Sequence, residues 1–335
     1  MNRLKTMLIC SLLLIACIGV FFSVDLYFYA GKPREKTTEK QMFAIGQGQG
    51  VGEISRRLAR EGFIGTPAKF RLLARIKGAD KHIKAGEYRL SAGMTPKEIL
   101  DVFTSGRVFL HKLTIPEGYT IRQIATLIQA AGLGTKEAFV LSATDPEFAG
   151  EMGIPGDTFE GYLYPETYHF PKGISEKDMI KAMVARLRKV ISSKWEKRAA
   201  ELGMSLHQVL TLASIIEKET GSAFERPMIS SVFHNRLKKR MRLESDPTVI
   251  YGIPNFNGNL TRKDLRTRTP YNTYRIKGLP RGPIANPGFA SIEAALYPNT
   301  SDYLYFVSKK DSTHHFSTNI RDHNKAVRKY QLKRR

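Results

Sequence analysis

The stretch LHQVLTLASIIEKET, residues Leu206–Thr220, contains neither Pro nor Gly and is predicted to form a helix. At about 100° per residue, the side chains of Leu210 and Ala213 fall within about 40° of Glu217 on a helical projection. Glu219, only two residues further on, is predicted to lie on the opposite, solvent-facing side. Glu217 is therefore an acidic residue on the apolar face of its helix.

This placement gives Glu217 two possible roles. A carboxyl group among Leu and Ala side chains loses hydration, so the pKa of Glu217 is expected to rise. A carboxyl group that holds its proton near neutral pH can act as a general acid. The alternative is a structural carboxylate that is buried against an arginine such as Arg226 or Arg236, because ion-pair networks also bury acidic groups. Geometry alone leaves both interpretations open.

The composition is that of a globular protein with a large positive charge. The 335 residues are 42% hydrophobic and 25% charged, and the formal net charge is +22. Such a charge favours an anionic partner, which can be nucleic acid, a lipid surface or an acidic polymer. The densest basic run, Arg236–Arg242, has no zinc-finger, RNP or helix-turn-helix signature beside it, so a solvated helix end is the preferred interpretation.

The sequence lacks the common motifs for metal or nucleophilic catalysis. Both cysteines, Cys10 and Cys17, lie in the first apolar segment, so the remaining chain cannot form a disulfide or a thiolate metal site. His314 and His315 are adjacent and would point apart on a strand. Neither an HExxH nor a GxSxG motif occurs. We therefore predict no metal and no cofactor.

The N-terminal segment is predicted to be a membrane anchor. Met7–Val24 is a run of 18 residues without a charge, at the short end for a membrane-spanning helix. Tyr27, Phe28 and Tyr29 follow as an interfacial aromatic belt, which favours an uncleaved anchor over a signal peptide. A cleaved signal stays the alternative, since Leu14–Cys17 resembles a lipoprotein cleavage box. Flanking charges do not fix the orientation, because long domains are translocated largely regardless of charge.

The rest of the chain is predicted to be α+β, in two folded parts. The expected boundaries are a tail at 1–6, a transmembrane helix at 7–24, a tether at 25–40, a small part at 41–108 and a larger part at 109–335. The small part shows strands near 42–45 and 86–90 and helices near 51–61, 66–76 and 95–106. The larger part is predicted to contain helices at 120–131, 178–200, 206–220 and 226–239, then loop-rich sequence, a strand at 303–307 and a basic C-terminal helix.

Aromatic and hydrogen-bonding residues in the larger part suit a carbohydrate ligand. The tract Tyr162–Tyr168 places three tyrosines around Pro165-Glu166, and sugar rings stack on aromatic faces while their hydroxyls need acceptors. Core aromatics at a tight turn are the alternative. The loop segments Asp246–Thr248, Tyr271–Tyr274 and Ser317–Asn319 add hydroxyl and amide groups of the kind that a carbohydrate groove needs.

The larger part also contains a series of unusual strings in a fixed order. They are Ala213–Thr220, Ser231–Leu237, Met241–Gly252, Tyr271–Tyr274, Gly278–Ile284 and Asn286–Gly288. This series resembles the membrane-bound endolytic murein transglycosylase family, the YceG-like proteins, and the resemblance covers essentially the whole chain. It implies a LysM-like module at 41–108 and a lytic transglycosylase domain at 109–335. It also implies a single-pass protein of the bacterial inner membrane, with its bulk on the cell-wall side, that cuts nascent glycan strands internally.

The resemblance places the catalytic glutamate at Glu217. The implied reaction cleaves the bond between N-acetylmuramic acid and N-acetylglucosamine and leaves 1,6-anhydro ends, so one carboxyl group suffices, with Glu166 or Asp246 as assisting neighbours. Glu244 and Arg281 depart from the Gln and Pro that the family usually carries. Substrate-binding roles are predicted for Ser214, Tyr164, Glu166, Asn235, Asp246, Thr248, Tyr271, Asn272, Tyr274 and Asn319.

The resemblance also selects among the anionic partners. Peptidoglycan carries peptides with free carboxylates, so it is an acidic polymer that a chain of charge +22 attracts. Peptidoglycan synthases are predicted as further partners, whereas nucleic acid is not. The competing interpretation is a non-catalytic anchor that binds peptidoglycan and holds the synthases at the membrane.

Overall fold

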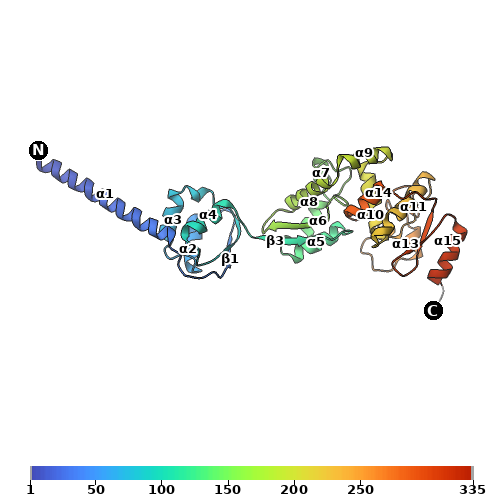
Figure 1. Cartoon of the computed structure of the whole chain (residues 1–335), viewed down its shortest axis with the longest axis horizontal. Coiled ribbons are helices and arrows are strands. Elements are labelled where there is room, and N and C mark those ends of the chain that lie inside the picture. Colours follow the sequence, from blue (N-terminus) through green and yellow to red (C-terminus); the bar gives the residue numbers. More distant parts are fainter. Residues whose placement is uncertain (1, 333–335) are drawn as a thin grey trace. The chain divides into compact units, whose positions relative to one another are not determined.

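The computed structural model describes residues 2–332, which divide into two compact units (Figure 1). The first unit ends at His111 and also takes in Pro171–Gly173, and the second holds the other described residues from Lys112 onward. The expected boundary was 108/109. Both units combine helices with short strands, which confirms the predicted α+β class.

The first unit is built on a two-stranded antiparallel sheet. Strand β1 (Gln41–Ile45) pairs with β2 (Gly86–Leu90), and Phe43 lies opposite Tyr88. Alternate residues of both strands point into one core that also contains Phe103. The core is completed by α2 (Val51–Arg60), α3 (Pro67–Ile76), the 3-10 turn η1 (Ala79–Lys81) and α4 (Pro96–Ser105). The two strands and the helices α2, α3 and α4 lie within two residues of their predicted positions, whereas η1 was not predicted.

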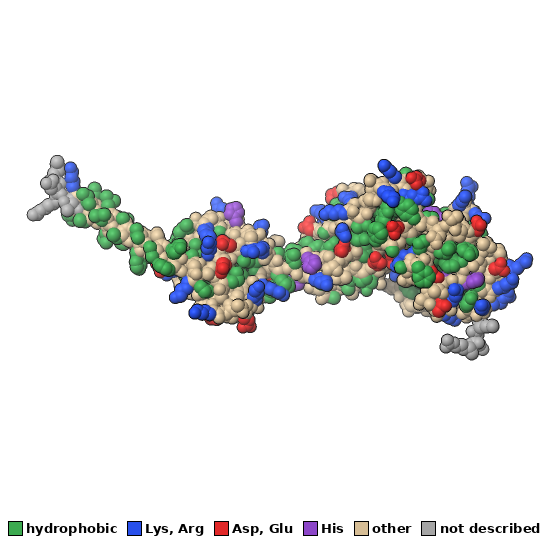
Figure 2. Space-filling model, viewed as in Figure 1, with side chains coloured by type: hydrophobic (Ala, Val, Ile, Leu, Met, Phe, Trp, Pro, Cys, Tyr) green, Lys and Arg blue, Asp and Glu red, His purple; other side chains and the backbone are tan. Residues whose placement is uncertain are grey.

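The N-terminal helix α1 (Asn2–Gly31) is longer than the predicted span. Its segment Met7–Gly31 is long and apolar enough to cross a membrane, and Figure 2 shows hydrophobic side chains exposed along it. The predicted tether at 25–40 differs in the structure, since the helix continues to Gly31. Beyond the helix, Arg34 donates a hydrogen bond to the main-chain oxygen of Ile64 at 2.9 Å. This segment is therefore fastened to the first unit.

The second unit is mainly helical, with two small sheets. Strand β3 (Leu110–Thr114) pairs with β4 (Thr167–Pro171), and β5 (Tyr305–Ser308) pairs antiparallel with β6 (His314–Ser317). Its helices are α5 (Ile121–Ala130), α6 (Lys136–Ala143), α7 (Pro146–Glu151), α8 (Glu176–Val190), α9 (Ser193–Glu201), α10 (Leu206–Glu219), η2 (Ala223–Glu225), α11 (Arg226–Lys238), α12 (Asp246–Tyr251), α13 (Arg262–Arg266), α14 (Phe289–Leu296), α15 (Ile320–Val327) and η3 (Arg328–Leu332).

The prediction of one helix over 178–200 is wrong. The backbone leaves the helical conformation at Ile191, where ψ is 110°, and α8 ends there. Ser192 then begins α9, because its side chain accepts a hydrogen bond from the main-chain N–H of Trp195. A serine side chain satisfies a free N–H at a helix start, and that gain favours two helices over one continuous helix.

Helix α10 is buried along most of its length within the second unit. Every residue from Val209 to Ile216 is buried, and α14, α11, α12 and α9 all contact the helix. Gln208 and Lys218 are exposed, whereas Glu219 is half-buried. The prediction that Glu219 faces solvent is therefore wrong. The helical projection considers only the helix itself, whereas segments from later in the chain cover its second side.

Candidate active site

Glu219, the last residue of α10, lies in an enclosed polar environment. Ser245 donates its hydroxyl to a Glu219 carboxyl oxygen at 2.5 Å. Burial raises the pKa of Glu219 to about 7; the Ser245 hydrogen bond opposes this rise, the charge of Asp246 adds to it and Arg236 opposes it. A carboxyl group with this pKa is partly protonated at neutral pH, which is the condition for a general acid.

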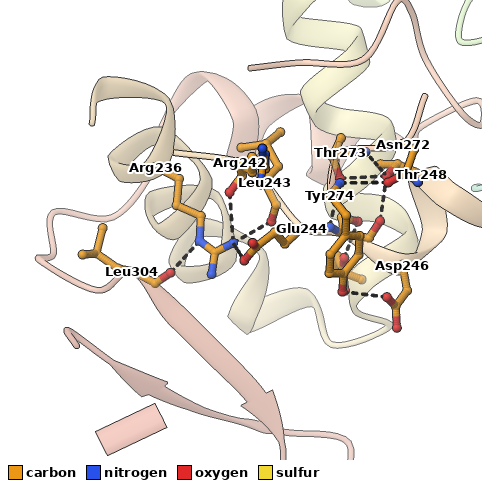
Figure 3. Close-up of polar contacts among 12 residues, drawn as sticks. Arg236, Arg242, Leu243, Glu244, Asp246, Thr248, Asn272, Thr273, Tyr274 and Leu304 are labelled. Atoms are coloured by element: carbon orange, nitrogen blue, oxygen red, sulfur yellow. Dashed lines mark hydrogen bonds and ion pairs between the residues drawn. The ribbon is translucent and has the colours of Figure 1, made fainter. Parts of the chain in front are cut away.

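The groups beside Glu219 come from the start of α12 and from a loop that precedes α14. The main-chain N–H of Ser245 donates to the hydroxyl of Thr273 at 3.0 Å, which fixes the position of Ser245. One residue further on, Asp246 accepts a hydrogen bond from the hydroxyl of Tyr274 at 2.8 Å (Figure 3). Burial raises the pKa of Tyr274, as does this hydrogen bond to Asp246. The start of α12 thus supplies a second carboxylate, Asp246, which Tyr274 of the loop holds in place.

A buried arginine forms another wall of the site. Arg236 of α11 donates from Nε to the oxygen of Leu304 at 2.6 Å and from a terminal nitrogen to the oxygen of Leu243 at 2.8 Å (Figure 3). The same terminal nitrogen lies 3.3 Å from a carboxylate oxygen of Glu244. The guanidinium carbon is 5.1 Å from the ring centre of Tyr305. These contacts hold a fixed positive charge close to the carboxyl groups.

Two pockets meet at Glu219. The first, of about 350 Å³, is lined by Glu219 together with Arg236, Glu244, Asp246, Tyr274, Tyr305, Phe306 and His323, among others. The second, of about 690 Å³, is lined by Glu219, Thr220, Ser222, Phe306, Ser308 and His314, among others. Glu219 and Phe306 line both pockets, so the two cavities are neighbours.

Glu217 has a different environment, although it is two residues away. Its side chain is 7% exposed, and one carboxylate oxygen accepts a hydrogen bond from Arg226 at 3.3 Å. The other oxygen accepts from the main-chain N–H of Gly288 at 3.0 Å. Burial, reinforced by the charge of Glu217, raises the pKa of Glu117 nearby. A guanidinium and a main-chain amide therefore occupy the two carboxylate oxygens of Glu217.

Four of the predicted site residues lie together around the Glu219 pocket or support it. Asp246 and Tyr274 line the pocket. Thr248 is fully buried, and its hydroxyl lies 2.8 Å from that of Thr273 (Figure 3). The Asn272 side chain accepts from the N–H of Tyr274 at 2.9 Å and donates to three main-chain oxygens of residues 264–267. Thr248 and Asn272 therefore hold the loops that carry the pocket residues.

The structure brings the other predicted site residues to no common place. Glu166 pairs with Arg186, and the same Arg186 lies over the ring of Tyr164. The Ser214 hydroxyl forms hydrogen bonds with the main chain at Thr211 and Ile284. Asn235 donates to two main-chain oxygens, of Ser301 and Tyr303; Tyr271 packs on Tyr251; and Asn319 caps α15. All of these contacts are contacts within the fold.

Sequence reasoning missed Ser245, Thr273, Tyr305 and His323 as neighbours of Glu219. It treated Arg236 as a possible partner of Glu217 or as part of a solvated helix end, whereas Arg236 is buried. The string Ser245-Asp246-Pro247 does carry the signal of a helix start, with Pro in the first turn. It gives no sign that the serine hydroxyl is directed to Glu219. Among residues 2–332, no group of three or more His, Cys, Asp or Glu side chains is arranged to hold a metal ion.

The chain matches known proteins along most of its length. The sequence model of the YceG-like family matches residues 43–329, and the chain belongs to this family. It is 35% identical to an endolytic murein transglycosylase of Bacillus subtilis (strain 168), over 89% of this chain and 87% of that one. It is 28% identical to the endolytic murein transglycosylase of Streptococcus pneumoniae serotype 2 (strain D39), covering 97% of this chain and 65% of the relative.

A solved structure shows the same fold. The crystal structure of a YceG-like protein from Listeria monocytogenes aligns with a TM-score of 0.60 and 39% identity. The alignment covers 87% of this chain and all of the Listeria chain. The similarity therefore includes most of the architecture described here.

Proposed function

We propose that this protein is an endolytic peptidoglycan lytic transglycosylase, a carbon–oxygen lyase that cuts inside glycan strands. The names of its relatives support this function. The observation that carries it is the Glu219 carboxyl group, whose pKa burial raises to about 7, at the meeting point of two pockets. A protonated acid with room for polymer on both sides is what internal cleavage of a glycan strand requires.

We assign the general acid to Glu219 and not to Glu217. Glu219 lines both pockets and holds a proton near neutral pH. Glu217 is bound by a guanidinium and a main-chain amide, and it lines neither pocket. The role of Glu217 is then structural, since its carboxylate joins the end of α10 to Arg226 and to the N-terminus of α14.

In the proposed reaction, protonated Glu219 donates its proton to the glycosidic oxygen between N-acetylmuramic acid and N-acetylglucosamine. The C–O bond to the leaving sugar breaks, and positive charge develops on the muramic acid ring. The 6-hydroxyl oxygen of that ring attacks its anomeric carbon, and the Glu219 carboxylate accepts the hydroxyl proton. The product is a 1,6-anhydro end, no water is consumed, and Glu219 is protonated again.

Asp246 is the second carboxylate in the proposed reaction. Glycosidases place a second carboxylate near the developing positive charge. Asp246 lines the same pocket as Glu219 and is oriented by the hydroxyl of Tyr274. Glu166, the other predicted neighbour, is paired with Arg186 and does not line either pocket. We therefore favour Asp246 as the group that stabilises the transition state.

The rest of the molecule fits a position at the cell wall. Helix α1 is the proposed single-pass anchor in the bacterial inner membrane, with both folded units on the cell-wall side. The first unit, with its βααβ order, is the proposed LysM-like glycan-binding module. The charge of +22 attracts an acidic polymer such as peptidoglycan. Peptidoglycan synthases are the proposed protein partners, because strands that are cut while growing must be near the enzyme that extends them.

The test compares Glu219→Gln with Glu217→Gln in the full chain, with purified peptidoglycan and mass spectrometry of the product ends. We expect Glu219→Gln to lose at least about 100-fold in the formation of anhydro ends, since a general acid contributes about 10²–10⁴. Glu217→Gln should keep most of its activity per folded molecule, with circular dichroism as the check on folding.

The opposite pattern, with a folded but inactive Glu217→Gln and an active Glu219→Gln, would show that Glu217 is the general acid. New reducing ends in place of anhydro ends would make the protein a hydrolase. If the wild type cleaves nothing, the non-catalytic scaffold is the better description.

A further inference from the structure

Helix α3 has an outer surface that is both basic and apolar. Leu72 is 44% exposed and Ile76 is 66% exposed, and they lie four residues apart, on one side of the helix. Arg71 and Arg75, also four residues apart and also exposed, form a parallel row beside them. The opposite side of α3, with Phe70, Leu73 and Ala74, is buried in the core of the first unit. This pattern is typical of a helix that lies in the surface of a membrane.

Two contacts fix the direction in which α3 runs along α1. The hydroxyl of Tyr29 donates to the main-chain oxygen of Thr66 at 3.0 Å, and Lys69 lies 2.7 Å from a carboxylate oxygen of Asp25. The residue numbers rise along α3 as they fall along α1. Helix α3 therefore runs back toward the apolar part of α1, and its exposed C-terminal half lies on the side from which α1 emerges.

The Asp25–Lys69 pair lies near the end of the apolar segment Met7–Gly31. Asp25 is the one acidic residue of α1, and its pairing with Lys69 neutralises the charge. Tyr27 and Phe28, both exposed, are residues of the kind that gather at the boundary between lipid and water. Ile76 lies seven residues beyond Lys69, which is about 10 Å along a helix at 1.5 Å per residue.

We propose that the C-terminal half of α3, residues 71–76, lies in the headgroup region of the membrane that α1 enters and binds its anionic lipids. Leu72 and Ile76 enter the boundary between headgroups and acyl chains, and Arg71 and Arg75 contact lipid phosphates. The proposal rests on the proposed anchoring by α1. The occupant is the membrane itself, because this surface continues from the apolar helix and has the charge that complements anionic lipid.

The test measures the depth of a nitroxide label in the full-length protein, reconstituted into nanodiscs of phosphatidylcholine with or without phosphatidylglycerol. The probe variant is Cys10→Ser, Cys17→Ser, Ile76→Cys. In anionic discs, we expect the ratio of collisions with oxygen to collisions with a water-soluble nickel complex to rise several-fold at position 76. Adding Arg71→Gln and Arg75→Gln should return most of the label to water, since each arginine contributes about fivefold to binding near such a surface.

Two controls separate this proposal from the anchoring on which it rests. A label at Cys17, in the Cys10→Ser protein, reports whether α1 is in the bilayer. A label at Leu141, which is 74% exposed in the second unit, should stay in water. A label at position 76 that stays in water while Cys17 is immersed overturns the proposal alone. Equal immersion at 76 and 141 also overturns it, because the contact is then unspecific. A Cys17 label in water refutes the anchoring and the proposal with it.

Discussion

Removal of the Ser245 hydroxyl should widen the pH range of activity on the alkaline side. Ser245 donates to a Glu219 carboxyl oxygen, and this hydrogen bond favours the ionised carboxylate. A hydrogen bond to a charged group contributes about 1.5–3 kcal/mol, and one pKa unit corresponds to about 1.4 kcal/mol. Ser245→Ala should therefore raise the pKa of Glu219 by about 1–2 units above its value of about 7.

The sign of the effect follows from the role of the acid. Only the protonated form of Glu219 can donate a proton, so the rate falls as the pH rises through the pKa. A higher pKa moves this alkaline limb upward by the same 1–2 units, to about the same extent in kcat and kcat/KM. The acid form becomes more populated, while the carboxylate becomes a stronger base for the 6-hydroxyl proton.

The assay is the initial rate of formation of anhydro ends between about pH 5 and pH 10. The matched control is Ser230→Ala, which removes a buried serine hydroxyl that makes no hydrogen bond in the described structure and is not part of the pocket. An alkaline limb that stays in place in Ser245→Ala, or moves to lower pH, would refute the assignment of the acid to Glu219. An equal shift of the alkaline limb in Ser230→Ala would show that the loss of the Ser245 hydroxyl is not the cause of the shift.

Two further predictions concern the stability of the second unit. The Glu160 carboxyl group is 3% exposed, and burial raises its pKa to about 7, against hydrogen bonds from Ile121, Tyr251 and Asn286. The pKa of Glu160 is about 7 in the folded protein and 4.5 in the unfolded chain, so this group stabilises the folded protein by up to about 3 kcal/mol at pH values below 4.5. That stabilisation is lost as the pH rises through 7. Glu160→Gln should flatten the fall in urea-unfolding free energy between pH 5 and pH 8, and an unchanged fall would contradict this explanation. Gly161 has φ +84°, and a Cβ there would lie 2.4 Å from Pro283, so Gly161→Ala should cost about 3 kcal/mol or more. Gly203→Ala, at φ +67° with no atom within 4 Å of the added Cβ, should cost only about 1 kcal/mol; equal losses in both variants would show that the Pro283 contact has no effect.

Local sequence signals predicted most elements of the fold. The starts of α3 and α4, each with Thr-Pro, follow from a β-region N-cap and a proline in the first turn, and both begin where expected. The long helix over 178–200 was wrong because amphipathic spacing continues across the break at Ile191. Ser192 was the signal for that break, since serine is a strong N-cap residue.

The site could be predicted only in part, for a reason that α10 illustrates. Periodicity identifies a helix and its more apolar face, and on that measure Glu217 is the unusual residue. Whether the opposite face meets water depends on segments that lie far away in the sequence, here α12 and the loop with Thr273 and Tyr274. Burial of Glu219 is thus a tertiary property. The sequence did single out the strings around Asp246 and Tyr274, whose side chains the structure brings to the pocket.

Ser245 also illustrates a conflict between local stability and activity. It stands at the N-cap of α12, where a serine side chain normally bonds a free N–H of the helix and contributes about 1 kcal/mol. Here it makes no such cap, and its hydroxyl is directed to Glu219. The helix start is therefore frustrated: stability of α12 favours a bond between the Ser245 hydroxyl and a helix N–H, whereas the proposed reaction uses the same hydroxyl to bind Glu219. Selection for thermal stability alone should accumulate substitutions at this helix start and shift the pKa of Glu219, and with it the pH range of activity, in the process.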